Sequence, residues 1–73
     1  MKFFAIGVAK AKLSEVIGIS QRDHVIVTNH GRPVAIIIGI DGIGLDTLEA
    51  ADGETLQRLI KEHWDKRAAK PNK

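Results

Sequence analysis

The stretch V-I-V-T-N-H-G-R-P-V-A-I-I-I, residues 25–38, decides the fold of this chain. Two runs rich in β-branched residues flank a polar break at residues 29–32, a composition that predicts a β-hairpin with a short loop. Pairing of Thr28 with Pro33 would place apolar side chains on both faces of the ribbon. The predicted cross-strand pairs are Val27 with Val34 and Val25 with Ile36 on one face, and Ile26 with Ala35 on the other. We therefore expect helices on one face and a second copy of the chain on the other.

The length and composition favour the same conclusion. A chain of 73 residues without cysteine forms one small core at most and has no disulfide or thiolate metal site to reinforce it, so oligomerisation is the expected reinforcement. No secretory signal peptide and no apolar run long enough to span a bilayer is visible. We expect a soluble, cytoplasmic homodimer without membrane contact.

The charges are unevenly distributed along the chain. Residues 1–38 carry a net charge of +3, residues 39–65 carry −5 and residues 66–73 carry +4. A basic first half followed by an acidic segment suggests two partners of opposite charge, nucleic acid and a basic protein. The alternative is a chance imbalance without functional meaning.

Helical and strand patterns surround the hairpin. Residues 2–6 form a short apolar run with two phenylalanines, which predicts a strand beside the hairpin. Apolar residues at helical spacing then predict one helix of about ten residues, capped by Gly7 and closed by Gly18. The predicted apolar face of this helix consists of Ala9, Leu13, Val16 and Ile17.

The segment after the hairpin has a different character. Three glycines in residues 39–44 predict irregular backbone, and Asp46 is the expected N-cap of a helix that Asp52-Gly53 limits to about two turns. An amphipathic helix is predicted from Glu54 onward. Residues 66–73 are expected to form a flexible basic tail.

No pattern for catalysis or for a cofactor is present. The three histidines lack the spacing of metal ligands, the serines lack a neighbouring histidine, and the glycines match no phosphate-binding fingerprint. We expect no metal, no cofactor and no enzymatic activity; a small enzyme is the weakest alternative.

Binding surfaces are better supported by the residue pattern. Lys10 is predicted in the first turn of its helix, where the helix dipole disfavours a cation. A lysine at this electrostatic cost suggests a functional contact. Lys12 lies on the other side of the apolar face, and His30 and Arg32 project from the hairpin loop, where they can reach a DNA backbone. The alternative is ordinary solvated charge.

The last predicted helix carries a narrow apolar stripe. It either completes the core of this domain or enters a groove on another protein, with Trp64 as the anchor. The glycines before it favour the second alternative, because they leave the helix loosely tied to the rest of the chain. The residues of this stripe are Leu56, Leu59, Ile60, His63 and Trp64.

Two segments together resemble a known family. A-K-A-K-L-S-E-V-I at residues 9–17 and H-V-I-V-T-N-H-G-R-P-V-A-I-I-I at residues 24–38 resemble the Phd/YefM antitoxins of type II toxin–antitoxin modules. These proteins typically show A-R-x-x-L-S-E-L-L and V-x-I-T-R-x-G-x-P-V-A-V-L-V. The match covers residues 2 to about 40 without gaps. Asn29 and His30 stand where the family usually has basic residues, and residues 39–44 depart from its S-L-E-D-Y.

The resemblance implies a fold and a function. The implied fold is a small α+β domain with a three-stranded antiparallel sheet and helices, dimerising through the sheet region, followed by a helical C-terminal arm. The implied function is an antitoxin that represses its own operon and covers a toxin, such as a RelE/ParE-like or PIN-domain ribonuclease or a Doc-like protein.

The resemblance also implies which residues serve each function. The expected DNA contacts are Lys10, Lys12, Asn29, His30 and Arg32; the expected dimer core is Val25, Val27, Val34, Ile36 and Ile38. The expected divisions are a dimerisation and DNA-binding domain at 1–44, a toxin-binding arm at 45–65 and a tail at 66–73. The main alternative is a small dimerising interaction module without DNA affinity.

Overall fold

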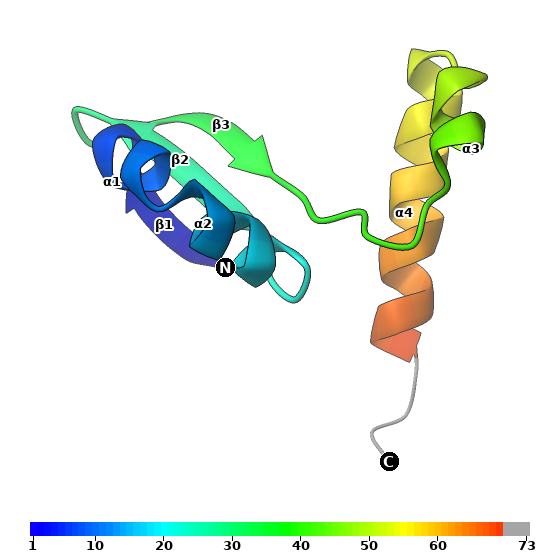
Figure 1. The fold of residues 1–73 in the computed structure, drawn as a ribbon, viewed down its shortest axis with the longest axis horizontal. Helices are drawn as coiled ribbons and strands as arrows, with labels where there is room; N and C mark the ends of the chain where they lie inside the picture. Colours follow the sequence, from blue (N-terminus) through cyan, green and yellow to red (C-terminus); the bar gives the residue numbers. More distant parts are fainter. Residues whose placement is uncertain (70–73) are drawn as a thin grey trace. The chain divides into compact units, whose positions relative to one another are not determined.

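The computed structural model describes the backbone of residues 1–69 and the side chains of residues 1–66. The chain divides into two compact units, Met1–Asp41 and Gly42–Lys73, here called the N-terminal unit and the C-terminal unit. The elements in chain order are β1 (Lys2–Ala5), α1 (Ile6–Ala11), α2 (Leu13–Ser20), β2 (Val25–Asn29), β3 (Arg32–Ile37), α3 (Leu45–Glu49) and α4 (Gly53–Ala69) (Figure 1).

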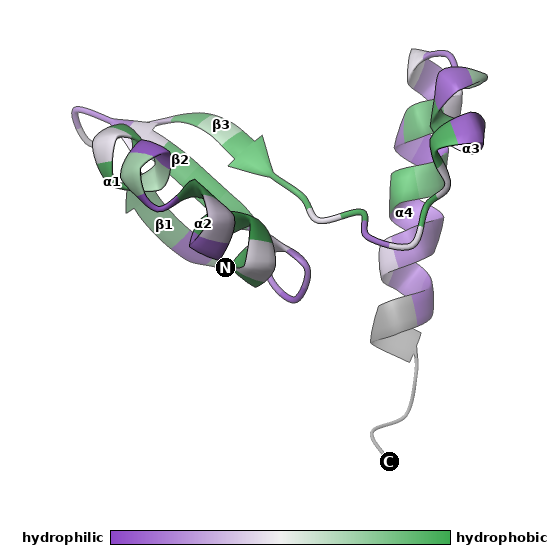
Figure 2. Cartoon of the chain, in the orientation of Figure 1, coloured by the Kyte–Doolittle hydropathy of each residue, from purple (hydrophilic) through white to green (hydrophobic). Residues whose placement is uncertain are grey.

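The sheet of the N-terminal unit is mixed, so the prediction of a purely antiparallel sheet is wrong. Its strand order is β1-β2-β3, with β1 parallel to β2 and β2 antiparallel to β3. The two helices between β1 and β2 return the chain to the end of the sheet at which β1 began, and such a crossover joins parallel strands. The hairpin itself is formed as predicted, with hydrophobic strands and a polar loop (Figure 2).

The register of the hairpin contains a bulge that changes the faces of β3. Thr28 pairs with Pro33 as predicted, but Val27 then pairs with Ala35, which leaves Val34 as an extra residue. Proline cannot donate a ladder hydrogen bond, and it is tolerated here because β3 is an edge strand with a bulge. From Ala35 onward, each residue of β3 pairs one position away from the predicted register. The predicted pairings of Val25 with Ile36, of Val27 with Val34 and of Ile26 with Ala35 are therefore wrong.

Two short helices replace the single helix predicted after β1. The break lies at Lys12, whose φ of −119° and ψ of 38° are not helical. Neither glycine has its predicted role, because Ala5 is the N-cap of α1 and Gly18 lies inside α2. The chain turns at Lys12 while its amide donates to the Val8 carbonyl at 2.9 Å and its carbonyl accepts from the Val16 amide at 2.9 Å.

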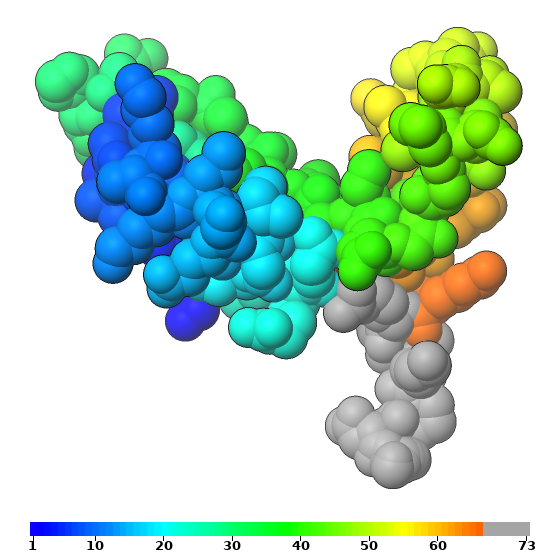
Figure 3. Space-filling view, in the orientation of Figure 1, coloured from blue at the N-terminus to red at the C-terminus, as the bar shows by residue number. Residues whose placement is uncertain are grey.

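The core lies between the two helices and one face of the sheet. Four apolar residues are buried, and three half-buried residues pack around them. The buried set is Ala9, Val16, Val25 and Val27, and the surrounding set is Phe4, Ile19 and Ile37. Leu13 and Ile17, predicted on the inner face of the helix, remain 53 % and 44 % exposed, because the break at Lys12 turns α2 relative to α1. In Figure 3 the helices, in blue, cover the near side of this unit.

The opposite face of the sheet carries a row of apolar side chains that no element of the N-terminal unit covers. Phe3 pairs with Ile26, and Ile26 pairs with Ile36, so the three side chains form one row across the strands. Phe3 is 65 % exposed and Ile36 is 47 % exposed. We call Phe3, Ile26 and Ile36 the outer row.

The residues expected in a dimer core therefore fall in different places. Val25 and Val27 are buried in the core of their own chain, whereas Ile36 belongs to the outer row. Val34 at the bulge is 55 % exposed, and Ile38, just beyond β3, is half-buried. The sequence-based set thus mixes the inner and the outer face, because the bulge was not foreseen.

Strand β1 is fixed at its start by polar contacts. The N-terminal ammonium lies 2.7 Å from a carboxylate oxygen of Asp23, and the Lys2 amide donates to the His24 carbonyl at 2.9 Å. The hydrogen bond from the ammonium holds the pKa of Asp23 below its usual value. These contacts set the register in which Lys2 pairs with Val25.

The C-terminal unit consists of α3 and α4. Gly44, rather than the predicted Asp46, is the N-cap of α3, and Asp46 lies in its first turn. Helix α4 begins at Gly53 and continues to Ala69, so it extends into the segment predicted as a flexible tail. Residues 70–73 of that tail lie outside the described residues.

Substitution of a core residue should show how much the small core contributes. We expect Val16→Ala to lower the free energy of unfolding by about 2 kcal/mol, because Val16 is fully buried. Val8→Ala is the matched control, since Val8 is also helical but 44 % exposed, and it should change stability by less than about 0.5 kcal/mol. Urea denaturation followed by circular dichroism measures both. Equal effects of the two substitutions would contradict the described core.

Candidate nucleic-acid interface and protein-binding helix

The tip of the hairpin is a two-residue loop with an uncommon backbone. His30 and Gly31 have φ angles of 52° and 77°, the signs that a type I′ turn requires at both central residues. Asn29 and Arg32 pair directly before and after the loop. All four residues are exposed, so the tip presents two side chains that donate hydrogen bonds, Asn29 and Arg32, beside the imidazole of His30.

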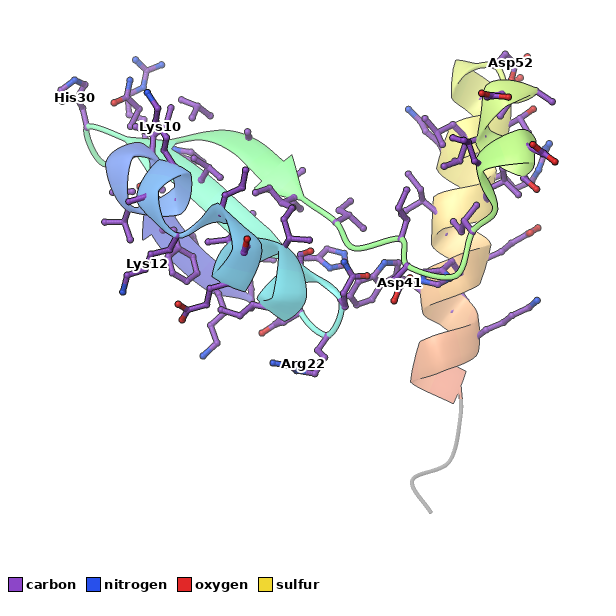
Figure 4. The ribbon with its side chains drawn as sticks, viewed as in Figure 1. Lys10, Lys12, Arg22, His30, Asp41 and Asp52 are labelled. Atoms are coloured by element: carbon purple, nitrogen blue, oxygen red, sulfur yellow. The ribbon has the colours of Figure 1, made fainter. Side chains whose placement is uncertain are left out.

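Helix α1 brings Lys10 to the same end of the N-terminal unit. Ala5 at the end of β1 pairs with Thr28, next to the hairpin tip, and α1 starts at the following residue. Figure 4 shows the labelled Lys10 and His30 at this end of the unit. We call Lys10, Asn29, His30 and Arg32 the hairpin-end cluster.

The sequence predicts Lys10 in the first turn of its helix. In the structure, Lys10 lies in the last turn of α1. A cation there is favoured by the helix dipole, so the inferred electrostatic cost does not exist. The sequence predicts one helix from about Gly7 to Gly18, whereas α1 ends at Ala11.

Lys12 does not join the hairpin-end cluster. It lies at the break between α1 and α2, and Figure 4 shows its side chain pointing away from Lys10. Arg22, beyond the end of α2, is also exposed and lies far from the hairpin end in the same view. The structure therefore brings together four of the five residues predicted to contact DNA.

The charges of the hairpin-end cluster are not neutralised within the described residues. Neither Lys10 nor Arg32 has a carboxylate within salt-bridge distance among residues 1–66, and both side chains are exposed. Free cations on a rigid ribbon and an adjacent helix suit the phosphates of a nucleic acid, while Asn29 can donate to a base edge or a phosphate.

Helix α4 separates an apolar stripe from a charged face. All five residues of the predicted stripe are half-buried: Leu56, Leu59, Ile60, His63 and Trp64. The opposite face is exposed and carries an ion pair between Lys61 and Asp65 at 2.9 Å, in which Asp65 raises the pKa of Lys61. No side chain between residues 42 and 66 is buried. Over residues 42–66, the C-terminal unit therefore has an amphipathic helix but no buried core.

The ring of His63 packs against the glycine-rich segment before α3. A Cβ atom added at Gly42 would lie 3.5 Å from Cε1 of His63, so the two residues are neighbours. The Nε2 atom of His63 is buried and has no hydrogen-bond partner among the described residues. Gly42 itself has a φ of 112°, which few residues other than glycine adopt.

Asp52 fixes the start of α4, a role that the sequence analysis missed. Its Oδ1 atom accepts a hydrogen bond from the Thr55 amide at 2.8 Å, the geometry of an N-cap. This bond from the Thr55 backbone holds the pKa of Asp52 below its usual value. The sequence analysis assigns Asp52-Gly53 only to the end of the preceding helix. An aspartate directly before an amphipathic run, with threonine three residues later, is also a signal for the start of a helix.

Comparison of the chain with protein-family models, with curated proteins and with solved structures finds no match. Among residues 1–69 no helix has both the length and the apolar composition needed to cross a membrane. The same described residues contain no cluster of three histidine, aspartate or glutamate side chains placed to hold a metal ion.

Acid titration should reveal the contribution of the Asp52 cap. Because the helix lowers the pKa of Asp52, its stabilising effect is present above the pKa of the unfolded state and is lost as the pH falls through the pKa of the helix. We expect Asp52→Ala to reduce the ellipticity at 222 nm of the full chain at neutral pH. Asp52→Asn should retain most of that ellipticity, since asparagine also caps, but should lose less of it on acidification.

Asp46→Ala is the control for this titration, because Asp46 lies in the first turn of α3 without a capping hydrogen bond. Identical titration curves for the native chain and the asparagine variant would contradict the assigned cap.

Proposed function

We propose that this chain is an antitoxin that binds operator DNA as a dimer through its N-terminal unit and inhibits a toxin protein, a ribonuclease, through its C-terminal unit. The single observation that carries the proposal is the division of the chain into a unit with a buried core and a unit in which none of the described side chains, residues 42–66, is buried. The first has the rigidity that DNA recognition needs, and the second has an apolar stripe that a partner can complete. The resemblance of residues 9–17 and 24–38 to the Phd/YefM antitoxins supports the same assignment.

The outer row supports dimerisation through the sheet. Three apolar side chains on a face without helices are costly in water, and a second copy of the same row is self-complementary about a two-fold axis. A dimer would also present two hairpin-end clusters, which is how paired modules read two half-sites on DNA.

The hairpin-end cluster supports DNA binding. Lys10 and Arg32 supply the charge for phosphate contacts, and Asn29 and His30 supply hydrogen-bonding groups beside them. Asn29 takes the place of the arginine that is usual in the family, so Arg32 on the following strand is the residue we expect to replace its charge.

The C-terminal unit supports inhibition of a basic protein. Residues 42–66 carry six acidic and three basic side chains, and a ribonuclease needs a basic surface to bind RNA. The stripe of α4 would enter an apolar groove with Leu59 and Trp64 near its centre, while the acidic groups contact the rim. Inhibition is then steric, because the helix occupies the surface that RNA would use.

DNA binding is tested by substitution within the hairpin-end cluster. With duplex DNA from upstream of the chain's own gene, Lys10→Ala and Arg32→Ala should each weaken binding and reduce the slope of log K against log salt by about 1. Arg22→Ala is the matched control, because Arg22 is equally exposed but lies away from the cluster. Gel shift at several salt concentrations measures all three. If the native chain does not bind this DNA, the result favours the alternative function, an interaction module without DNA affinity.

Inhibition by the C-terminal unit is tested by co-expression with the product of the neighbouring gene. We expect the full chain to restore growth and a chain truncated after Ile43 to fail. Leu59→Ala with Trp64→Ala should also fail, because both residues belong to the stripe, whereas Gln57→Ala on the exposed face should still protect. Protection by the truncated chain would refute the assignment of the arm.

A further inference from the structure

The residues that follow β3 are held against the end of α2 by a small set of contacts. Gly39 is buried, and its amide donates to the Ser20 carbonyl at 3.0 Å. A Cβ atom at this position would lie under 3.0 Å from the Ser20 carbonyl oxygen and from Oε1 and Cα of Gln21. Two of these three atoms belong to the backbone and cannot move aside. Only glycine fits here, and the reason is the close approach of two chain segments.

The side chain of Gln21 joins the same two segments. Its Oε1 atom accepts a hydrogen bond from the Asp41 amide at 2.9 Å, and its Nε2 atom donates to the Ile17 carbonyl at 3.1 Å. One amide group thus ties the last residue of the N-terminal unit to a carbonyl near the end of α2. Ser20, which is 1 % exposed, supports the corner with its own hydrogen bond to the Ile17 carbonyl at 2.6 Å.

We propose that Gln21 is a releasable latch that holds residues 40–41 at the end of α2 and thereby sets the length of the tether between the two units. The hydrogen bonds that join Gln21 to Asp41 and to Ile17 are exposed, so water can replace them, and a longer contact of 3.5 Å runs from Nε2 of Gln21 to the Ser20 hydroxyl. With the latch closed, the tether consists of residues 42–44, between Asp41 and the start of α3 at Leu45. With the latch open, residues 40–41 join it and add up to about 7 Å of reach, while the Gly39 amide keeps its hydrogen bond to the Ser20 carbonyl.

A latch of this kind has a use in a protein that binds two partners. A partner whose binding requires a longer tether between the two units can open the latch. A partner that binds with the shorter tether leaves it closed. This use rests on the proposed function. The latch itself rests only on the contacts of Gln21 and Gly39, so it stands or falls independently of DNA and toxin binding.

Hydrogen exchange tests the latch in the full chain. In the native chain the Asp41 amide should be protected, and Gln21→Ala should speed its exchange by roughly 2- to 10-fold, the loss expected for one hydrogen bond. The amides of Val16 and Val27 should exchange at unchanged rates, because the core is not altered. An Asp41 amide that exchanges equally fast in the native chain and the variant would overturn the proposal.

Distance measurements test the effect on the tether. The chain has no cysteine, so spin labels can be placed at Glu15→Cys and Gln57→Cys, both exposed positions, with unlabelled chain in excess to isolate distances within one chain. Gln21→Ala and Gly39→Ala should each extend the distance distribution to longer values. Gly18→Ala is the matched control, because a Cβ atom there meets nothing within 4 Å. An unchanged distribution for Gln21→Ala, or an equal extension for Gly18→Ala, would overturn the latch.

Discussion

The constraint on which the rest of the structure depends is that the sheet has helices on one face only. The helices and the inner face bury Ala9, Val16, Val25 and Val27, and this is the whole buried apolar core of the described residues. The outer row of Phe3, Ile26 and Ile36 has no such cover within its unit. A core of this size gives little stability by itself, and burial of the outer row in the proposed dimer would add to it.

The two units differ in the contacts that stabilise them. The N-terminal unit fixes its sheet through the parallel pairing of β1, the contact between the N-terminal ammonium and Asp23, and the bulge in β3. The C-terminal unit relies on the Asp52 cap and on local helical contacts, and none of its described side chains is buried. A unit with a buried core and a unit without buried side chains among its described residues are compatible with the two binding functions proposed above.

The sequence predicted the features that depend on local patterns. The hairpin, the preceding strand, the stripe of α4 and the pairing of Thr28 with Pro33 all follow from composition and spacing. The features that it did not predict arise from single residues in tertiary context: the extra residue at Val34, the break at Lys12 and the packing of Gly39 against Gln21. The sequence does imply that either Phe3 or Phe4 lies on the outer face, because adjacent residues in a strand point to opposite faces.

The oligomeric state is the most direct measure of this account, because both the burial of the outer row and the pairing of hairpin tips depend on it. Sedimentation equilibrium of the full chain should give twice the chain mass of 8.0 kDa, and Ile36→Glu, in the outer row, should give the mass of one chain. Leu13→Glu, on the helical side and similarly exposed, should leave the dimer intact. A native chain that sediments as a monomer, or an Ile36→Glu variant that remains dimeric, would contradict the account.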